Sequence, residues 1–432
     1  MLNQPTLLID DSQGSRSLVP LASLSFVVGA FAGLVGASFR ILLQSAEGWR
    51  TYVISRLQLW GWLGFPVLVL GTALVAAFAA WLVFRFAPQS SGSGIPNVEH
   101  QLKIGWSGNP VPTVIVKFVG GILAIGGGLA LGREGPTVQM GAGIGHIIGR
   151  AFHRNENECR VLLAAGAGAG LATAFNAPIA GAIFVLEELV GVFDLPVTVS
   201  TLGASAAAIA VSRVFLGQSP DFRVPALDYA GFGVLPASLL LGAVLGLVGV
   251  AYNLSLVRAL DLTARFSRLH GTLRAACIGA FVGLVGWFVP SLIGAGDALT
   301  QSVFDSHYLF AALLSSFALR FFLGPLSYAA RTPGGLFAPM LTVGSQAGLL
   351  FFMLWTRLLT HLASSPQQFA IVGIAAFFAA VVRAPLTGIV LAVELTGSFS
   401  LFLPMLGASF AAALTASILK NPPIYESLRE GR

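Results

Sequence analysis

Apolar runs long enough to cross a lipid bilayer dominate this sequence. They cover roughly 17–44, 62–86, 111–150, 160–193, 196–217, 231–257, 273–294, 308–358, 367–397 and 399–419. Because the hydrocarbon core of a bilayer is about 30 Å thick, a helix of about 20 apolar residues spans it. The runs do not alternate between apolar and polar residues, which disfavours a membrane β-barrel. The sequence therefore predicts an all-α, multi-pass integral membrane protein.

Composition narrows the class of protein further. Charged residues make up only 10% of the 432 residues, and hydrophobic residues make up 56%. A soluble domain is usually about one-quarter charged. We therefore exclude a cytosolic enzyme, a disordered tail and a secreted disulfide scaffold, and we predict no enzymatic activity, no cofactor and no metal site. The net charge of +6 does not indicate nucleic-acid binding, because the aromatic residues lie in the apolar runs and not among basic residues.

The chain resembles itself in two places. GREGPTVQMGAGIG at 132–145 matches GLFAPMLTVGSQAG at 335–348, and NAPIAGAIFVLEEL at 176–189 matches RAPLTGIVLAVELT at 383–396. Internal repeats with helices interrupted by Gly and Pro are typical of membrane transporters. We predict the following organisation: a polar N-terminal segment at 1–16, a first transmembrane repeat at 17–217, a linker at 218–230, a second repeat at 231–420, and a C-terminal segment at 421–432 that contains Tyr425.

The loop at 258–274 indicates how the chain is oriented. It contains four arginines and one acid, Asp261. Loops rich in Lys and Arg stay on the cytoplasmic side of the membrane. We therefore expect this loop to be cytoplasmic.

Few ionisable residues lie inside the apolar runs. Because a charge at mid-membrane depth costs at least a few kcal/mol, each is a candidate for function. We assign a structural role to Arg320, Arg383 and Glu394, and we consider Glu99 a candidate partner for Lys117. Glu134 differs from these, because it lies in a Gly-rich break, GREGP at 132–136, just ahead of an apolar run.

Two other segments share this pattern of a Gly-rich break that ends in proline: SGSGIP at 91–96 and PGGLFAP at 333–339. Proline suits the first turn of a helix, and the free N–H groups of a helix start attract anions. Three such breaks could together bind an anion through backbone N–H groups and a hydroxyl such as that of Ser93. The carboxylate of Glu134 could compete with the anion for the same N–H groups.

These motifs, together with Tyr425 near the end of the chain, resemble those of the CLC chloride channels and proton–chloride antiporters. The resemblance covers about 20–430 and implies a homodimer in which each subunit consists of two inverted repeats of short, tilted and broken helices. It implies a prokaryotic type in the inner (plasma) membrane, in contact with lipid, without the cytoplasmic nucleotide-binding domains of many eukaryotic members. Chloride and protons are the implied partners, with chloride as the bound substrate ion.

The resemblance also implies roles for single residues. Glu134 would be the external gate and outer proton acceptor. The remaining chloride-binding residues would act through hydroxyls (Ser93 and Tyr425), through backbone N–H groups at the central site (Leu336 and Phe337), and through backbone lining the outer site (Arg133 and Gly135).

The residue at position 188 separates two kinds of CLC protein. Members that resemble proton-coupled antiporters often carry a second, inner glutamate as the latter of two adjacent acids, and Glu188 matches that position. We therefore predict a chloride–proton antiporter in which Glu188 is the internal proton relay. A passive chloride channel, gated by voltage or pH, remains the alternative, and a membrane scaffold with vestigial motifs is a third possibility.

Overall fold

The computed structural model describes residues 11–106, 108–227, 232–265, 271–305, 308–358 and 365–430. In this part of the chain 17 α-helices are present, and nine of the helical segments are long and apolar enough to cross a membrane. The helices of the first half are α1 (Asp11–Gln58), α2 (Gly64–Phe86), α3 (Ile95–Ile104), α4 (Val111–Gly126), α5 (Glu134–Ala151), α6 (Glu156–Phe175), α7 (Pro178–Phe184) and α8 (Leu195–Leu216). A π-helical segment, η3 (Val185–Val190), continues α7.

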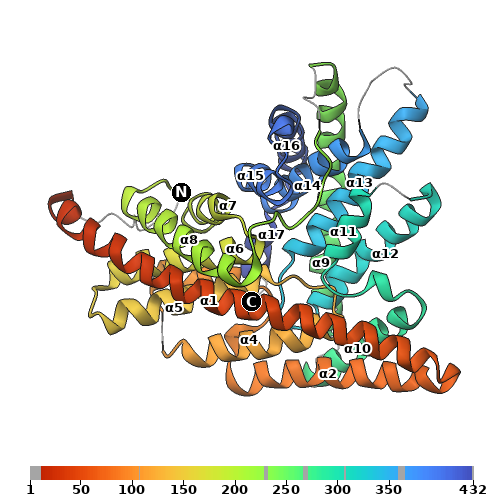
Figure 1. Cartoon of the computed structure of the whole chain (residues 1–432), viewed down its shortest axis with the longest axis horizontal. Helices are drawn as coiled ribbons and strands as arrows, with labels where there is room; N and C mark the ends of the chain where they lie inside the picture. Colours follow the sequence, from red (N-terminus) through yellow and green to blue (C-terminus); the bar gives the residue numbers. More distant parts are fainter. Residues whose placement is uncertain are drawn as a thin grey trace.

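The second half contains nine helices. They are α9 (Leu235–Arg265), α10 (Gly271–Phe288), α11 (Asp297–Phe304), α12 (Phe310–Tyr328), α13 (Phe337–Leu358), α14 (Pro366–Val382), α15 (Pro385–Thr396), α16 (Phe402–Ile418) and α17 (Ile424–Glu430). Figure 1 shows α1 running diagonally across the molecule, with α2, α4 and α10 along the lower edge of the view and α14, α15 and α16 on the opposite side.

The two halves pack their helices in the same order. In the first half α1 contacts α8 and α5 contacts α6, and in the second half α9 contacts α16 and α13 contacts α14. Glycines allow the closest of these contacts in both halves. A Cβ atom on Gly141 would collide with the carbonyl group of Gly166, and one on Gly344 would lie 2.9 Å from the carbonyl oxygen of Gly373. Small residues let membrane helices approach closely enough for van der Waals packing, and these glycines have that role in both halves.

Two glutamates join the halves reciprocally. Glu187, in η3, accepts hydrogen bonds from the backbone N–H groups of Leu386 (3.0 Å) and Thr387 (2.7 Å) at the start of α15. Glu394, in α15, accepts them from the N–H groups of Ile179 (3.1 Å) and Ala180 (2.7 Å) at the start of α7. Each half therefore caps a helix of the other, as expected for repeats related by a two-fold axis. The structural role predicted for Glu394 is confirmed.

The other two charges assigned a structural role also bind backbone. Arg320 donates to the carbonyl oxygens of Gly294 and Ala295, at 2.7 Å each. Arg383 donates to those of Ala380 (2.6 Å) and Asn421 (2.8 Å). Both guanidinium groups stabilise irregular backbone, and the prediction is confirmed for them as well.

The helical membrane fold is confirmed, and local details add to it. Helix α1 begins at Asp11, inside the segment predicted as a polar N-terminus. The basic loop predicted at 258–274 is shorter than its sequence suggests, since α9 continues to Arg265 and α10 begins at Gly271. Arg268 lies outside the described residues. The boundaries of the two repeats stay a prediction.

The reciprocal caps lead to a stability prediction. Replacing Glu394 with alanine leaves the N–H groups of Ile179 and Ala180 without their acceptor, so we expect the protein to lose about 1–2 kcal/mol of stability. A thermal melt of the detergent-solubilised protein measures this change. Glu156→Ala is the control, because Glu156 forms an exposed ion pair with Arg150 and such pairs contribute little. Equal melting temperatures for the two variants would contradict a capping role.

Candidate functional site

The three Gly-rich breaks meet in the interior and bind one another through backbone hydrogen bonds. The N–H of Gly92 donates to the carbonyl of Thr332 (3.1 Å), and the N–H of Gly334 donates to that of Gly92 (3.0 Å). Gly132 and Gly335 exchange two further bonds, of 2.8 and 2.7 Å. Backbone groups inside a membrane protein must find partners within the protein. The breaks satisfy this requirement in pairs, which fixes their relative positions.

The closeness of these breaks requires glycine at two of the positions. A Cβ atom on Gly335 would lie 2.9 Å from the backbone nitrogen of Gly135, and one on Gly135 would lie 2.9 Å from the Cα of Ser93. Both distances are shorter than real Cβ contacts allow. The three segments therefore touch backbone to backbone.

Lys117, on α4, supports the first break from behind. Its side chain is fully buried, and its ammonium group donates to the carbonyl oxygens of Ser90 (2.8 Å) and Gly92 (2.6 Å). Glu99, the partner considered from the sequence, forms ion pairs with Lys103 and Arg429. Lys117 therefore anchors the backbone of the segment that carries Ser93.

The helices that follow the breaks begin at this meeting point, as the sequence predicts: α3 at Ile95, α5 at Glu134 and α13 at Phe337. Within the described residues, no acceptor hydrogen-bonds to the backbone N–H groups of Leu336 or Phe337. Free N–H groups at a helix start carry partial positive charge. The site is thus suited to an anion without a basic side chain in contact with it.

The carboxylate of Glu134 lies at this site and is fully buried. Its Oε2 accepts a hydrogen bond from the N–H of Ala338 on α13 at 3.4 Å, and its Oε1 has no hydrogen-bond partner within the described residues. The side chain belongs to α5 but binds the start of α13. A carboxylate therefore lies where the two helix starts converge.

Two buried hydroxyl groups complete the surroundings. The side chains of Ser93 and Tyr425 are at most 1% exposed, and neither hydroxyl has a hydrogen-bond partner in the part of the chain described. The side chain of Ser93 nevertheless lies close enough to the Tyr425 hydroxyl to act on it electrostatically. The ring of Tyr425 packs edge-on against Phe337, with ring centroids 6.2 Å apart. Buried polar groups are rarely left unpaired, so these hydroxyls are suited to donate to a bound ion.

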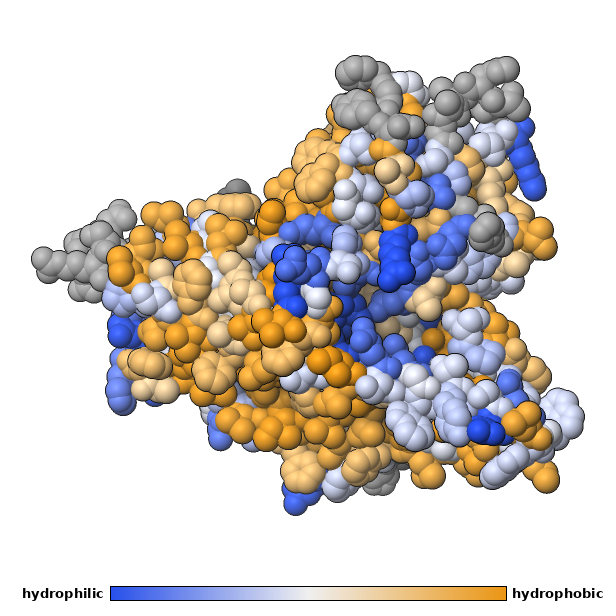
Figure 2. Space-filling view, in the orientation of Figure 1, coloured by the Kyte–Doolittle hydropathy of each residue, from blue (hydrophilic) through white to orange (hydrophobic). Residues whose placement is uncertain are grey.

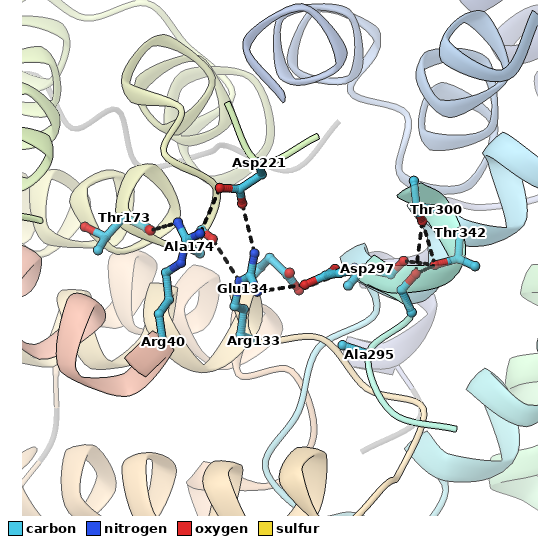
Figure 3. A network of polar contacts seen from close by, with 12 residues as sticks. Arg40, Arg133, Glu134, Thr173, Ala174, Asp221, Ala295, Asp297, Thr300 and Thr342 are labelled. Carbon is cyan, nitrogen blue, oxygen red and sulfur yellow. Dashed lines mark hydrogen bonds and ion pairs between the residues drawn. The ribbon is translucent and has the colours of Figure 1, made fainter. Parts of the chain in front are cut away.

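An ion-pair network lies beside Glu134 (Figure 3). Arg133 binds Asp221 at 2.9 Å and Asp297 at 2.8 Å, and its Nε donates to the carbonyl of Ala174 at 2.9 Å. Asp221 also binds Arg40 at 2.8 Å. The guanidinium of Arg133 is therefore engaged by protein acceptors, which leaves its backbone as the part that can line an outer site.

The network links distant parts of the chain. Arg40 belongs to α1, Asp221 to the segment between the halves, and Asp297 to the start of α11. The side chain of Asp297 is 36% exposed, whereas those of Arg133 and Asp221 are 8% and 10% exposed. The network thus extends from the buried site towards solvent. Figure 2 shows that hydrophilic side chains gather in a hollow near the centre of one face, with apolar side chains on its flanks.

Glu188 lies apart from Glu134, in the π-helical segment η3. It is partly buried, and the charged groups that act on it are Glu99 on α3, the adjacent Glu187 and Glu426 on α17. Glu187 is held by the start of α15, whereas no hydrogen bond from Glu188 is found among the described residues. Of the two adjacent acids, Glu187 is therefore the one that caps a helix.

The fold and site define a multi-pass membrane protein in which helix starts converge on a buried carboxylate. The family model described as "Voltage gated chloride channel" matches residues 75–417. Relatives include the H(+)/Cl(-) exchange transporter ClcA of Vibrio cholerae serotype O1 (strain M66-2), which is 39% identical over 94% of this chain and 88% of the relative. ClcA of Salmonella typhimurium (strain LT2) is 36% identical over 96% of this chain and 89% of its own length. The chain belongs to the CLC family of chloride channels and transporters.

Solved structures agree with this assignment. The crystal structure of a slow cyanobacterial Cl-/H+ antiporter has a TM-score of 0.91 and 33% identity, covering 95% of this chain and 97% of that one. A CLC-type fluoride/proton antiporter, with a TM-score of 0.79 and 22% identity over 95% of this chain and 98% of that one, shares the fold. The resemblance noted from the sequence motifs is confirmed.

The structure brings together Ser93, Glu134, Leu336, Phe337 and Tyr425, and it places Arg133 and Gly135 beside them. Sequence reasoning missed Asp221, Asp297 and Ala338. Ala338 lies two residues after Leu336, within the GLFAP motif at 335–339, so this motif could have indicated it. Asp221 and Asp297 lie in polar segments far from every motif, and no local pattern marks them.

Proposed function

We propose that this protein exchanges chloride for protons across the membrane. The observation that carries the proposal is the buried carboxylate of Glu134 at the convergence of two helix starts, beside the unpaired hydroxyls of Ser93 and Tyr425. Relatives at 36% to 39% identity are H(+)/Cl(-) exchange transporters, and this supports exchange over passive conduction.

Chloride binds centrally by direct hydrogen bonds. The hydroxyls of Ser93 and Tyr425 donate to it, and the backbone N–H groups of Leu336 and Phe337 donate from the start of α13. Hydrogen bonds to a charged acceptor contribute about 1.5–3 kcal/mol each, net of the water that they replace. The backbone of Arg133 and Gly135 lines a second position, nearer the outer network.

Glu134 couples the two ions because it is itself an anion. While ionised, its carboxylate accepts from the N–H of Ala338 and occupies the outer position. Protonation removes the charge that the helix starts attract. The side chain then leaves, and chloride enters in its place. Each time Glu134 binds a proton, chloride thus replaces its carboxylate at this position.

Glu188 passes protons between Glu134 and the cytoplasmic side. Its carboxyl lies among the carboxylates of Glu99, Glu187 and Glu426, and a proton bound there relieves repulsion between like charges. Because Glu187 holds the start of α15, it stays in place while Glu188 is loaded and unloaded. The route of the protons therefore separates from the route of chloride on the inner side of the protein.

We further propose that the protein is a homodimer in a prokaryotic plasma membrane. The named relatives are bacterial proteins. Large apolar side chains on α8 and α16, such as Leu202 and Phe410, are 47% and 65% exposed in the single chain and offer a surface for a second copy or for lipid. Native mass spectrometry of the detergent-solubilised protein tests the subunit number.

The gate assignment predicts a specific defect. Glu134→Gln cannot lose or gain a proton, so in proteoliposomes at zero voltage we expect chloride flux to persist while chloride-driven proton uptake falls at least tenfold. A chloride electrode and a pH electrode measure the two fluxes together. Glu156→Gln, on the exposed surface, is the control and should retain both. Proton uptake at the wild-type level in Glu134→Gln would refute the gate.

The relay assignment predicts a similar result at the other acid. Glu188→Val removes the inner proton acceptor, and we expect it to abolish proton uptake while chloride flux continues. An unchanged ratio of protons to chloride would place the relay elsewhere. In wild-type protein, chloride flux without any proton uptake would identify a passive channel, and the lack of both fluxes would identify a scaffold.

The central site predicts an effect on binding. Tyr425→Phe removes one hydroxyl donor and little else, so we expect chloride affinity in isothermal titration calorimetry to fall about 13- to 160-fold. Tyr252→Phe is a matched control, because the Tyr252 hydroxyl is also buried without a partner among the described residues but packs against Phe321 and Phe377. Wild-type affinity in Tyr425→Phe, or an equal loss in both variants, would argue against the site.

A further inference from the structure

Arg331 has a left-handed backbone conformation just after the end of α12, where its N–H donates to the carbonyl of Tyr328 at 3.1 Å. Its φ angle is +56°, in the left-handed region that L-residues other than Asn, Asp and Gly rarely adopt. Within the described residues, no hydrogen bond or ion pair involves its guanidinium. Such strain costs about 1–3 kcal/mol and concentrates at functional positions.

Of the other left-handed residues, His153 (φ +53°) and Lys420 (φ +52°) also have exposed side chains, whereas two bind backbone through their side chains. Arg383, at φ +73°, donates to the carbonyls of Ala380 and Asn421. Asn176, at φ +52°, donates to the carbonyl of Ser219. Arg331 differs from both because its side chain is exposed and stabilises no other segment.

The side chain of Arg331 lines a cavity of about 610 Å³. Gly92 and Tyr328 line it on the side of the central site, and the Tyr328 hydroxyl accepts a hydrogen bond from the N–H of Ser93 at 3.3 Å. Asp261, near the C-terminal end of α9, lines it as well. This end of α9 enters the basic loop that the sequence places in the cytoplasm. With the loop at 258–274 on the cytoplasmic side, the cavity is an inner vestibule that reaches Gly92 and Tyr328, the neighbours of Ser93.

The backbone of Arg331 is fixed to the chloride-binding segment. Its carbonyl oxygen accepts from the Ser91 hydroxyl at 3.2 Å, and the carbonyl of the next residue, Thr332, accepts from the N–H of Gly92. Among the described residues that line the cavity, Arg331 and Asp261 are the charged ones. They form no ion pair with each other, and Arg274 lies within electrostatic reach of Arg331. Two positive charges, on Arg331 and Arg274, and one negative charge, on Asp261, thus lie in or near the cavity.

We propose that Arg331 is an anion-collecting residue of the inner vestibule, which raises the local concentration of small monovalent anions such as chloride next to Ser93. It acts through its electrostatic field and does not bind the ion in the central site. A charge within a narrow cavity attracts counter-ions, and added salt screens this attraction. The inference rests on the proposed exchange of chloride.

Two substitutions separate the charge from the backbone. Arg331→Lys keeps the charge, whereas Arg331→Gly removes it and suits the left-handed conformation. In proteoliposomes at limiting chloride and an ionic strength of roughly 20 mM, we expect Arg331→Gly to reduce chloride flux about threefold. At roughly 300 mM, set with a salt that is not transported, the difference should almost vanish. Arg331→Lys should match the wild type, and Arg331→Gly should melt about 1–2 °C higher because strain is relieved.

Arg357→Gln is the matched control. It also removes one exposed arginine, but Arg357 lies near the far end of α13, about 30 Å from Phe337 by helix length. The proposal is overturned if Arg331→Gly has wild-type chloride flux, or if its flux falls equally at both salt concentrations. It is also overturned if chloride flux falls in Arg331→Lys, or falls equally in Arg357→Gln. A lower melting temperature of Arg331→Gly would contradict it as well. If the wild-type protein shows no proton uptake, exchange is refuted, but the role of Arg331 can still be tested by chloride flux. If the wild-type protein shows no chloride flux, both exchange and the role of Arg331 are refuted.

Discussion

The backbone hydrogen bonds between the helix breaks are the interaction on which the site depends. Irregular backbone inside a membrane protein is stable only when its N–H and C=O groups find partners. Here Gly92 binds the segment at 332–334, and Gly132 binds Gly335. These bonds use some of the polar groups of each break, and the ammonium of Lys117 binds the carbonyl of Ser90 and also that of Gly92. The N–H groups that remain free point to a single place.

This arrangement explains why a chain so poor in charge can handle an anion. Partial charges on helix starts replace basic side chains, and the nearest guanidinium, that of Arg133, is engaged by Asp221, Asp297 and the Ala174 carbonyl. A full positive charge in contact with the ion would bind it too firmly for rapid release. Basic charge is placed instead around the site, in the outer network and, as we propose, at Arg331 in the inner vestibule.

The duplicated architecture brings these parts together. Glu187 and Glu394 each cap a helix of the opposite half, so the two halves are joined by charge-assisted hydrogen bonds as well as by packing. The capping of α15 also distinguishes the two adjacent acids, since it occupies Glu187 and leaves Glu188, the proposed relay, without a hydrogen bond among the described residues. One structural device thereby supports both the fold and the proposed proton route.

Local chemistry determined much of this protein. Apolar runs of bilayer length, proline after glycine at 92–96 and 132–136, and an acid within the second of these breaks are properties of short segments. They were sufficient to predict the membrane helices, the three helix starts, the family and the residues Ser93, Glu134 and Tyr425. The tertiary structure decided which buried groups became partners: Ala338 with Glu134, the Ser90 and Gly92 carbonyls with Lys117, and Asp221 and Asp297 with Arg133. Such pairs join residues far apart in the chain, and their geometry depends on how whole helices pack, so no local pattern of residues encodes them.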